Sequence, residues 1–127
     1  MRKKLYFIAL LCLSFFYLGC SSMPEQNTAT IELAGNPTTG YTWVYTMSPE
    51  GIVREVSNDY IVDRADLIGS GGKFIYVFES ITEGVTELIF SYLRVWEVDI
   101  PAVETLIYNA IVDGNNNLTF QEIRDES

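Results

Sequence analysis

From residue 28 onward, apolar side chains recur at every second position, and this pattern constrains the fold more than any other feature of the chain. In residues 41–47 an aromatic side chain or a methionine occupies every odd position, and in residues 74–79 an aromatic side chain occupies every even position up to 78. Side chains two residues apart lie on the same face of a β-strand. No stretch of this region shows a sustained helical period, so we predict an antiparallel all-β domain.

The remaining segments of this region are rich in β-branched and aromatic residues, which favour strands. We predict strands at 30–33, 52–57, 60–63, 86–96, 105–112 and, in the tail, 118–123. Between them, Gly, Pro, Asn and Asp form turn signals, including Asn58-Asp59. The spacing of these signals indicates a sandwich or a barrel. The predicted core contains Trp43, Tyr45, Phe74, Tyr76, Leu88, Phe90 and Tyr108.

The N-terminus has the pattern of a bacterial secretory signal. Residues 2–4 are basic, residues 5–18 carry no charge, and small residues follow at 19–22. An uncharged run of this length is short for spanning a bilayer, which takes about 20 residues. We therefore predict a cleaved signal peptide, with a buried N-terminal helix as the alternative.

The end of this signal, Leu18-Gly19-Cys20-Ser21, resembles the lipobox of bacterial lipoproteins, although Tyr17 stands where a branched aliphatic residue is usual. The resemblance implies that residues 1–19 are removed and that Cys20 is lipidated, which attaches the protein to a membrane of the cell envelope. Residues 20–27 then form a polar tether, and residues 28–127 form the domain. Cys12 is lost with the signal, so the mature chain keeps no thiol for a disulfide.

Charge and composition exclude several function classes. The formal net charge is -9, and in residues 20–127 five basic against seventeen acidic side chains give -12. Such a surface repels phosphate backbones, so we predict no nucleic-acid partner. The chain contains no histidine, which excludes Ser-His-Asp, Cys-His and His-zinc chemistry. We predict no cofactor and no enzymatic activity.

Three predicted loops have unusual sequences, which are Asn36-Pro37-Thr38-Thr39-Gly40, Gly69-Ser70-Gly71-Gly72 and Arg94-Val95-Trp96. The first two, taken alone, read as ordinary turns, because Pro and Gly are common turn residues. The third lies at the end of a strongly apolar predicted strand. Arg and Trp belong to the types enriched at binding hot spots, but Trp96 also fits a position in the core.

Taken together and in this order, the three loops resemble the chagasin family, proteinaceous inhibitors of papain-like cysteine proteases. The matching positions are Asn36 to Tyr41 with Trp43 two residues on, then Gly69-x-Gly71-Gly72, then Arg94-x-Trp96. The resemblance covers about residues 28–112. The chain departs from the family in Val95, where proline is usual and would make the loop more rigid, and in its tail after Val112.

The resemblance implies an immunoglobulin-like antiparallel β-sandwich whose three loops lie side by side at one end. It also implies a monomeric, reversible, non-covalent inhibitor in which the first loop enters the middle of the protease cleft, with the other two on either side. Pro37 would lower the entropy lost on docking, Arg94 and Trp96 would supply charge and aromatic area, and Trp43 would pack behind the loop. The implied protease-binding residues are Asn36, Pro37, Thr38, Thr39, Gly40, Tyr41, Gly69, Gly71, Gly72, Arg94 and Trp96.

Two other functions remain as alternatives, a membrane-tethered binding module for a carbohydrate or protein ligand and an enzyme. An inhibitor needs its three loops at one end, whereas a sugar-binding module would display aromatic side chains along a sheet face. A calcium site at Asp113-x-Asn115-x-Asn117 is disfavoured, because Leu118 and Arg124 occupy the positions of the Gly and Glu of an EF-hand loop. We predict no metal site.

Overall fold

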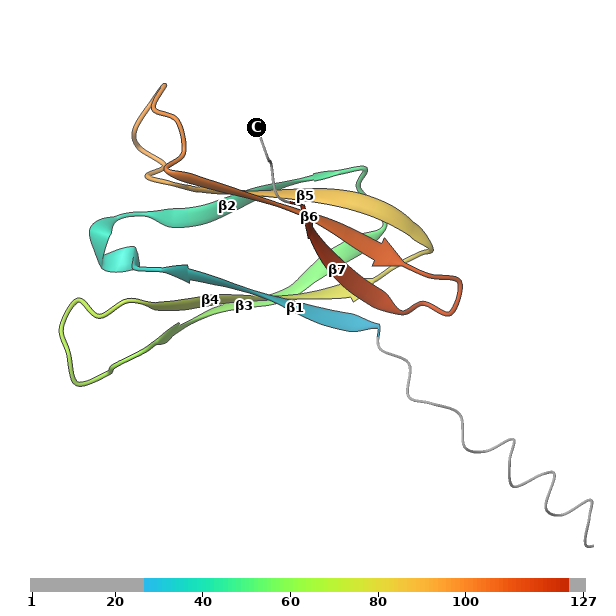
Figure 1. Ribbon diagram of the computed structural model, residues 1–127, viewed down its shortest axis with the longest axis horizontal. Coiled ribbons are helices and arrows are strands. Elements are labelled where there is room, and N and C mark those ends of the chain that lie inside the picture. Colours follow the sequence, from blue (N-terminus) through green and yellow to red (C-terminus); the bar gives the residue numbers. More distant parts are fainter. Residues whose placement is uncertain (1–26, 124–127) are drawn as a thin grey trace, which may run out of the picture.

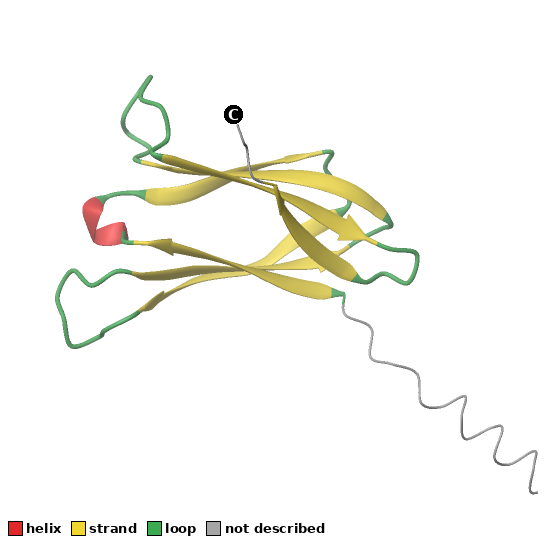
Figure 2. Ribbon diagram, viewed as in Figure 1, coloured by secondary structure: helices red, strands yellow, loops and turns green. Residues whose placement is uncertain are grey.

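The computed structural model describes residues 27–123, which form two antiparallel sheets packed face to face (Figure 1). The first sheet has the strand order β1-β4-β3 and the second has the order β2-β5-β6-β7. The strands are β1 (Thr28–Gly35), β2 (Thr42–Ser48), β3 (Val53–Val62), β4 (Gly72–Ser80), β5 (Gly84–Leu93), β6 (Glu104–Val112) and β7 (Leu118–Ile123). One short 3-10 helix, η1 (Pro37–Thr39), joins β1 to β2 (Figure 2). The predicted all-β, immunoglobulin-like sandwich is confirmed.

The core lies between the sheets and is largely aromatic. The ring of Phe90, which is completely buried, has its centroid 5.0 Å from Tyr45, 5.3 Å from Tyr76 and 5.9 Å from Tyr108. Of the predicted core residues, four are buried and three are partly buried against the core, so the predicted faces are confirmed. The buried ones are Trp43, Tyr76, Leu88 and Phe90, and the partly buried ones are Tyr45, Phe74 and Tyr108.

Two predicted strands are in fact one. Segments 52–57 and 60–63 belong to the continuous strand β3, and the predicted turn at Asn58-Asp59 is wrong. Both residues pair with β4, opposite Tyr76 and Ile75, and their side chains are exposed at a sheet edge. The irregularity in β3 lies earlier, between Glu55 and Ser57, where the register shifts. Pairing along the whole of β4 therefore outweighs the turn preference of Asn and Asp.

The predicted strand 86–96 extends too far. β5 ends at Leu93, and Arg94 begins a turn in which the amide of Glu97 donates to the Arg94 carbonyl at 3.1 Å. The last residues of the segment therefore leave the sheet, which frees Arg94 and Trp96 to contact a neighbouring loop.

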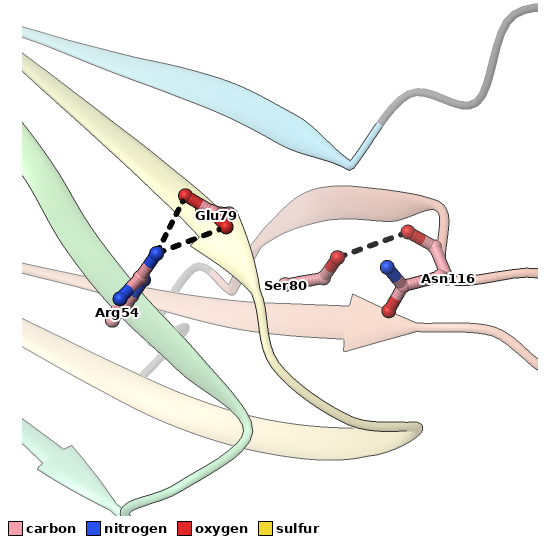
Figure 3. Close-up of polar contacts among 4 residues, drawn as sticks. All are labelled: Arg54, Glu79, Ser80 and Asn116. Atoms are coloured by element: carbon pink, nitrogen blue, oxygen red, sulfur yellow. Dashed lines mark hydrogen bonds and ion pairs between the residues drawn. The ribbon is translucent and has the colours of Figure 1, made fainter.

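The end of the sandwich that carries the β6–β7 turn is fastened by polar contacts (Figure 3). The Ser80 hydroxyl on β4 donates to the Asn116 carbonyl at 3.0 Å, which ties the first sheet to the turn of the second. Arg54 on β3 reaches both carboxylate oxygens of Glu79 on β4, at 3.1 and 3.2 Å. β7 matches its predicted range, and its Phe120 ring packs on Phe78 of the opposite sheet. The tail thus completes the core.

The side chain of Asp113 shapes the β6–β7 turn. Its carboxylate accepts hydrogen bonds from the amides of Asn115 and Asn117, at 2.9 and 3.0 Å. The hydrogen bond from the backbone N–H of Asn117 lowers the pKa of Asp113, because it favours the charged carboxylate.

Tyrosine ionisation should make the fold unstable in alkali. Burial, and then the nearby Glu55 carboxylate, raise the pKa of Tyr45 from 10.0 to about 12, and burial also raises the pKa values of Tyr76 and Tyr108. Between about pH 10 and pH 12 the unfolded chain loses tyrosine protons that the folded chain keeps, so the free energy of unfolding falls as pH rises. We expect the urea midpoint to drop from about pH 10 upward, with a smaller drop for Tyr45→Phe. A midpoint that stays constant to about pH 11 would contradict this.

Several sequence predictions lie outside residues 27–123. These are the signal peptide at 1–19, the lipidated Cys20 and all but the last residue of the tether at 20–27, and they stay predictions. Within the part that the structure describes, no helix has the length and apolar character needed to cross a membrane.

Candidate functional site

Three connections meet at one end of the sandwich, on the left of Figure 1. Loop 1 (residues 36–41) joins β1 to β2, loop 2 (residues 63–71) joins β3 to β4, and loop 3 (residues 94–103) joins β5 to β6. Loop 1 lies in the middle, because it hydrogen-bonds to both of the others. The side-chain Nδ2 of Asn36 donates to the Gly69 carbonyl of loop 2 at 2.9 Å, and Arg94 Nε of loop 3 donates to the Thr39 carbonyl at 3.1 Å. This is the arrangement that the resemblance predicts.

Loop 1 is held in a compact turn by its own side chains. Asn36 caps η1, and its Oδ1 accepts from the Thr38 amide at 3.1 Å and from the Thr38 hydroxyl at 2.6 Å. The Thr39 hydroxyl donates to the Asn36 carbonyl at 2.6 Å. Pro37 suits the first helical position, because its fixed φ matches the turn and its missing N–H needs no partner there. The tip of the loop, Pro37 to Thr39, is exposed and preformed.

The exit from loop 1 requires glycine. Gly40 has a φ of 87°, in the left-handed region, and its amide closes the turn on the Pro37 carbonyl at 3.0 Å. A Cβ at this position would also overlap the indole ring of Trp96. The glycine is therefore needed both for the backbone conformation and for the close approach of loop 3.

An aromatic stack supports loop 1 from below. The Tyr41 ring stacks on Tyr92 at 5.3 Å between centroids, and Tyr92 in turn lies 4.9 Å from Trp43. The Tyr92 hydroxyl accepts a hydrogen bond from the backbone N–H of Asn36 at 2.8 Å, and the Trp43 indole N–H donates to the Ala34 carbonyl at 3.1 Å. The prediction that Trp43 packs in the sandwich behind the loop is confirmed. Tyr92 is a supporting residue that the sequence analysis missed, since it lies 56 residues from Asn36 and carries no motif.

Loop 2 presents apolar side chains on a short turn. Its ends are joined by the Asp63 amide, which donates to the Gly71 carbonyl at 2.9 Å. At its tip, Leu67 is half exposed and Ile68 is completely exposed, just before Gly69, whose φ is 78°. Gly72, by contrast, is buried at the start of β4, where a Cβ would overlap the Ile61 carbonyl. Gly72 therefore lets β3 and β4 pair closely.

Loop 3 folds back onto loop 1. Trp96 rests on Gly40, yet 64% of its surface stays exposed. The Arg94 guanidinium lies 4.4 Å from the centre of the Tyr41 ring and 3.5 Å from the Glu97 carboxylate. The structure thus brings the predicted residues of the first and third loops into direct contact.

Exposed apolar surface is concentrated at this end. Half of the fourteen large apolar side chains that are exposed in residues 27–123 belong to loops 2 and 3. They are Leu67, Ile68, Val95, Trp96, Val98, Ile100 and Val103. A concentration of exposed apolar side chains around a rigid polar tip is typical of a protein-binding surface. Residues 27–123 contain no group of three His, Cys, Asp or Glu side chains that could hold a metal ion.

The sequence profile of the chagasin family of peptidase inhibitors, family I42, matches residues 22–110. The chain belongs to this family. It is therefore a protease inhibitor and not an enzyme. The match ends inside β6, so β7 lies beyond the part that the family profile covers.

Two similar proteins come from the amoeba Entamoeba histolytica. Amoebiasin-1 is 37% identical to this chagasin-family chain over an alignment of 84 residues, and the match covers 57% of this chain and 79% of amoebiasin-1. The crystal structure of EhICP2, a cysteine protease inhibitor, matches with a TM-score of 0.62 at 20% identity, over 69% of this chain and 80% of that one. The likeness to EhICP2 shows that the two proteins share a fold.

Proposed function

We propose that this chagasin-family chain inhibits papain-like cysteine proteases by inserting loop 1 into the active-site cleft, with loops 2 and 3 on either side. The observation that carries the proposal is the position of loop 1, preformed and hydrogen-bonded between two loops that expose apolar side chains. The membership in a family of peptidase inhibitors supports it, as does the shared fold with a cysteine protease inhibitor.

The chemistry of the chain points to inhibition by shape. Residues 21–127 contain neither histidine nor cysteine, so this part of the chain has no thiol or imidazole to attack or bond the protease. The compact 3-10 turn at Pro37–Thr39 also differs from the extended backbone that a peptide substrate presents for cleavage. We infer a reversible, non-covalent complex in which the inhibitor is not cut.

Rigidity of the loops is the expected source of affinity. A loop that is already held by Asn36, Tyr92 and Arg94 loses little conformational freedom on docking. Protease–inhibitor interfaces bury on the order of 1,600 Å² in total, and most of the binding energy comes from a few residues. Thr38 at the tip and Trp96 beside it are the residues that we expect to contribute most.

The arrangement of the aromatic side chains argues against the carbohydrate-binding alternative. In residues 27–123 the only exposed aromatic side chain is Trp96, and it lies among the three loops. The other aromatic rings are buried or partly buried, so neither sheet displays the aromatic face that a sugar-binding module would need.

The proposal is tested by titrating papain with the folded fragment of residues 21–127 and following the progress curves of substrate hydrolysis. We expect inhibition that dilution reverses and an inhibitor that stays intact on a denaturing gel. A serine protease serves as the control and should keep its activity. Failure to inhibit several papain-like enzymes at micromolar fragment would refute the proposal, and equal inhibition of the serine protease would refute its specificity.

We also propose that Cys20 is lipidated and anchors the inhibitor to a membrane of the cell envelope. β1 begins at the end of the sandwich opposite the three loops (Figure 1), where the Ser80 amide of β4 donates to the Asn27 carbonyl at 2.8 Å. An anchor on this side would leave the loops facing away from the membrane. We expect Cys20→Ser to abolish lipid labelling of the protein and to block its processing. A Cys20→Ser protein that is processed normally and stays in the membrane would exclude the anchor.

A further inference from the structure

We infer that Arg94 is a positioning residue, which acts by holding loop 1 in its binding shape and not by pairing with a charge on the protease. This inference rests on the proposed function. It differs from the sequence analysis, in which Arg94 was expected to supply charge at the interface.

The Arg94 side chain is engaged within the inhibitor on three sides. Its Nε donates to the Thr39 carbonyl at 3.1 Å, its guanidinium lies 4.4 Å from the centre of the Tyr41 ring, and its Nη1 lies 3.5 Å from a carboxylate oxygen of Glu97. About a third of the side chain is exposed. The positive charge is therefore balanced by Glu97, which makes it a weak attractor for a second carboxylate on another protein.

The contact with Thr39 ties the second half of loop 1 to loop 3 by a hydrogen bond. Asn36 fixes the first half of the loop, through the Gly69 carbonyl and the Tyr92 hydroxyl. Thr39 ends η1, and a carbonyl at the end of a helix has no partner in the helix itself. Arg94 supplies that partner, and its plane also covers Tyr41, the residue that follows the turn.

Two features of arginine are needed for this role. The Nε–H donates in the plane of the guanidinium while the face of the same plane stacks on the tyrosine ring. Lysine keeps the charge but has neither the planar face nor a donor at the Nε position. Replacement of Arg94 by lysine therefore separates positioning from charge pairing.

The first test compares the full chain, purified in detergent, with Arg94→Gln and Arg94→Lys by amide hydrogen exchange. We expect the amides of Thr39 and Gly40 to exchange about tenfold faster in both variants, while the amides of β4 and β5 keep their rates. Arg54→Gln is the matched control, because Arg54 is an exposed arginine on β3 that pairs with Glu79 at the end of the sandwich away from the three loops. Unchanged exchange at Thr39 and Gly40 in Arg94→Gln would overturn the inference.

The second test measures inhibition of papain by the same proteins. We expect Arg94→Gln and Arg94→Lys each to weaken inhibition roughly tenfold, by the same factor at about 0.05 and 0.5 M salt, because no charge on the protease is involved. Recovery of inhibition by lysine, or a loss that shrinks in high salt, would show a charge contact and overturn the inference. If the unaltered chain does not inhibit papain, the proposed function fails, whereas the exchange rates still decide whether Arg94 holds loop 1.

Discussion

Thr38→Arg is expected to weaken inhibition of papain by about 3 to 5 kcal/mol, the largest effect of any substitution that we consider. Thr38 is at the exposed tip of η1, where the proposed complex places it deepest in the cleft. A long charged side chain there would clash with the floor of the cleft and would lose its hydration without a partner. It would also remove the 2.6 Å hydrogen bond from the Thr38 hydroxyl to Asn36.

The measurement is the inhibition constant of the purified variant, together with its thermal unfolding. Thr82→Arg is the matched control, because Thr82 is also exposed but follows β4 at the end of the sandwich away from the three loops. We expect the control to inhibit like the unaltered protein and both variants to unfold near the same temperature. A Thr38→Arg protein that is folded and inhibits normally would exclude loop 1 from the interface.

Trp96→Ala is expected to weaken inhibition by about 2 kcal/mol, the size typical of a binding hot spot. One side of the indole ring covers Gly40, and most of the ring is still exposed for a partner to cover. Removal of the ring therefore deletes contact area and also uncovers the exit of loop 1. Stability should change little, because the side chain is mainly outside the core.

The control for this variant is Ile81→Ala, which removes an exposed apolar side chain at the other end of the sandwich. We expect Ile81→Ala to leave the inhibition constant unchanged within about twofold. Trp96→Phe should recover part of the lost affinity, since it restores an aromatic ring over Gly40. Equal inhibition by Trp96→Ala and the unaltered protein would remove loop 3 from the proposed interface.

The chain's local patterns were enough to predict most of the fold. Alternation in residues 41–47 and 74–79 indicated which side chains face the core, because the period of two depends only on the strand itself. The same reasoning went wrong at Asn58 and Asp59, whose preference for turns was outweighed by pairing with β4. Local preference does not include the neighbouring strand, so it could not show that β3 continues.

For the candidate site, too, the sequence predicts one part of the structure and leaves another part to the tertiary contacts. The motif Asn36 to Gly40 by itself determines a capped turn, since the cap, the proline and the left-handed glycine all act within five residues. Only the tertiary structure decided that Arg94 reaches the carbonyl of Thr39, 55 residues away, and that Tyr92 supports Asn36 across 56 residues. These contacts depend on the pairing of β2 with β5 and on the packing of the sheet that contains β1 against theirs, and no local pattern in the sequence records that.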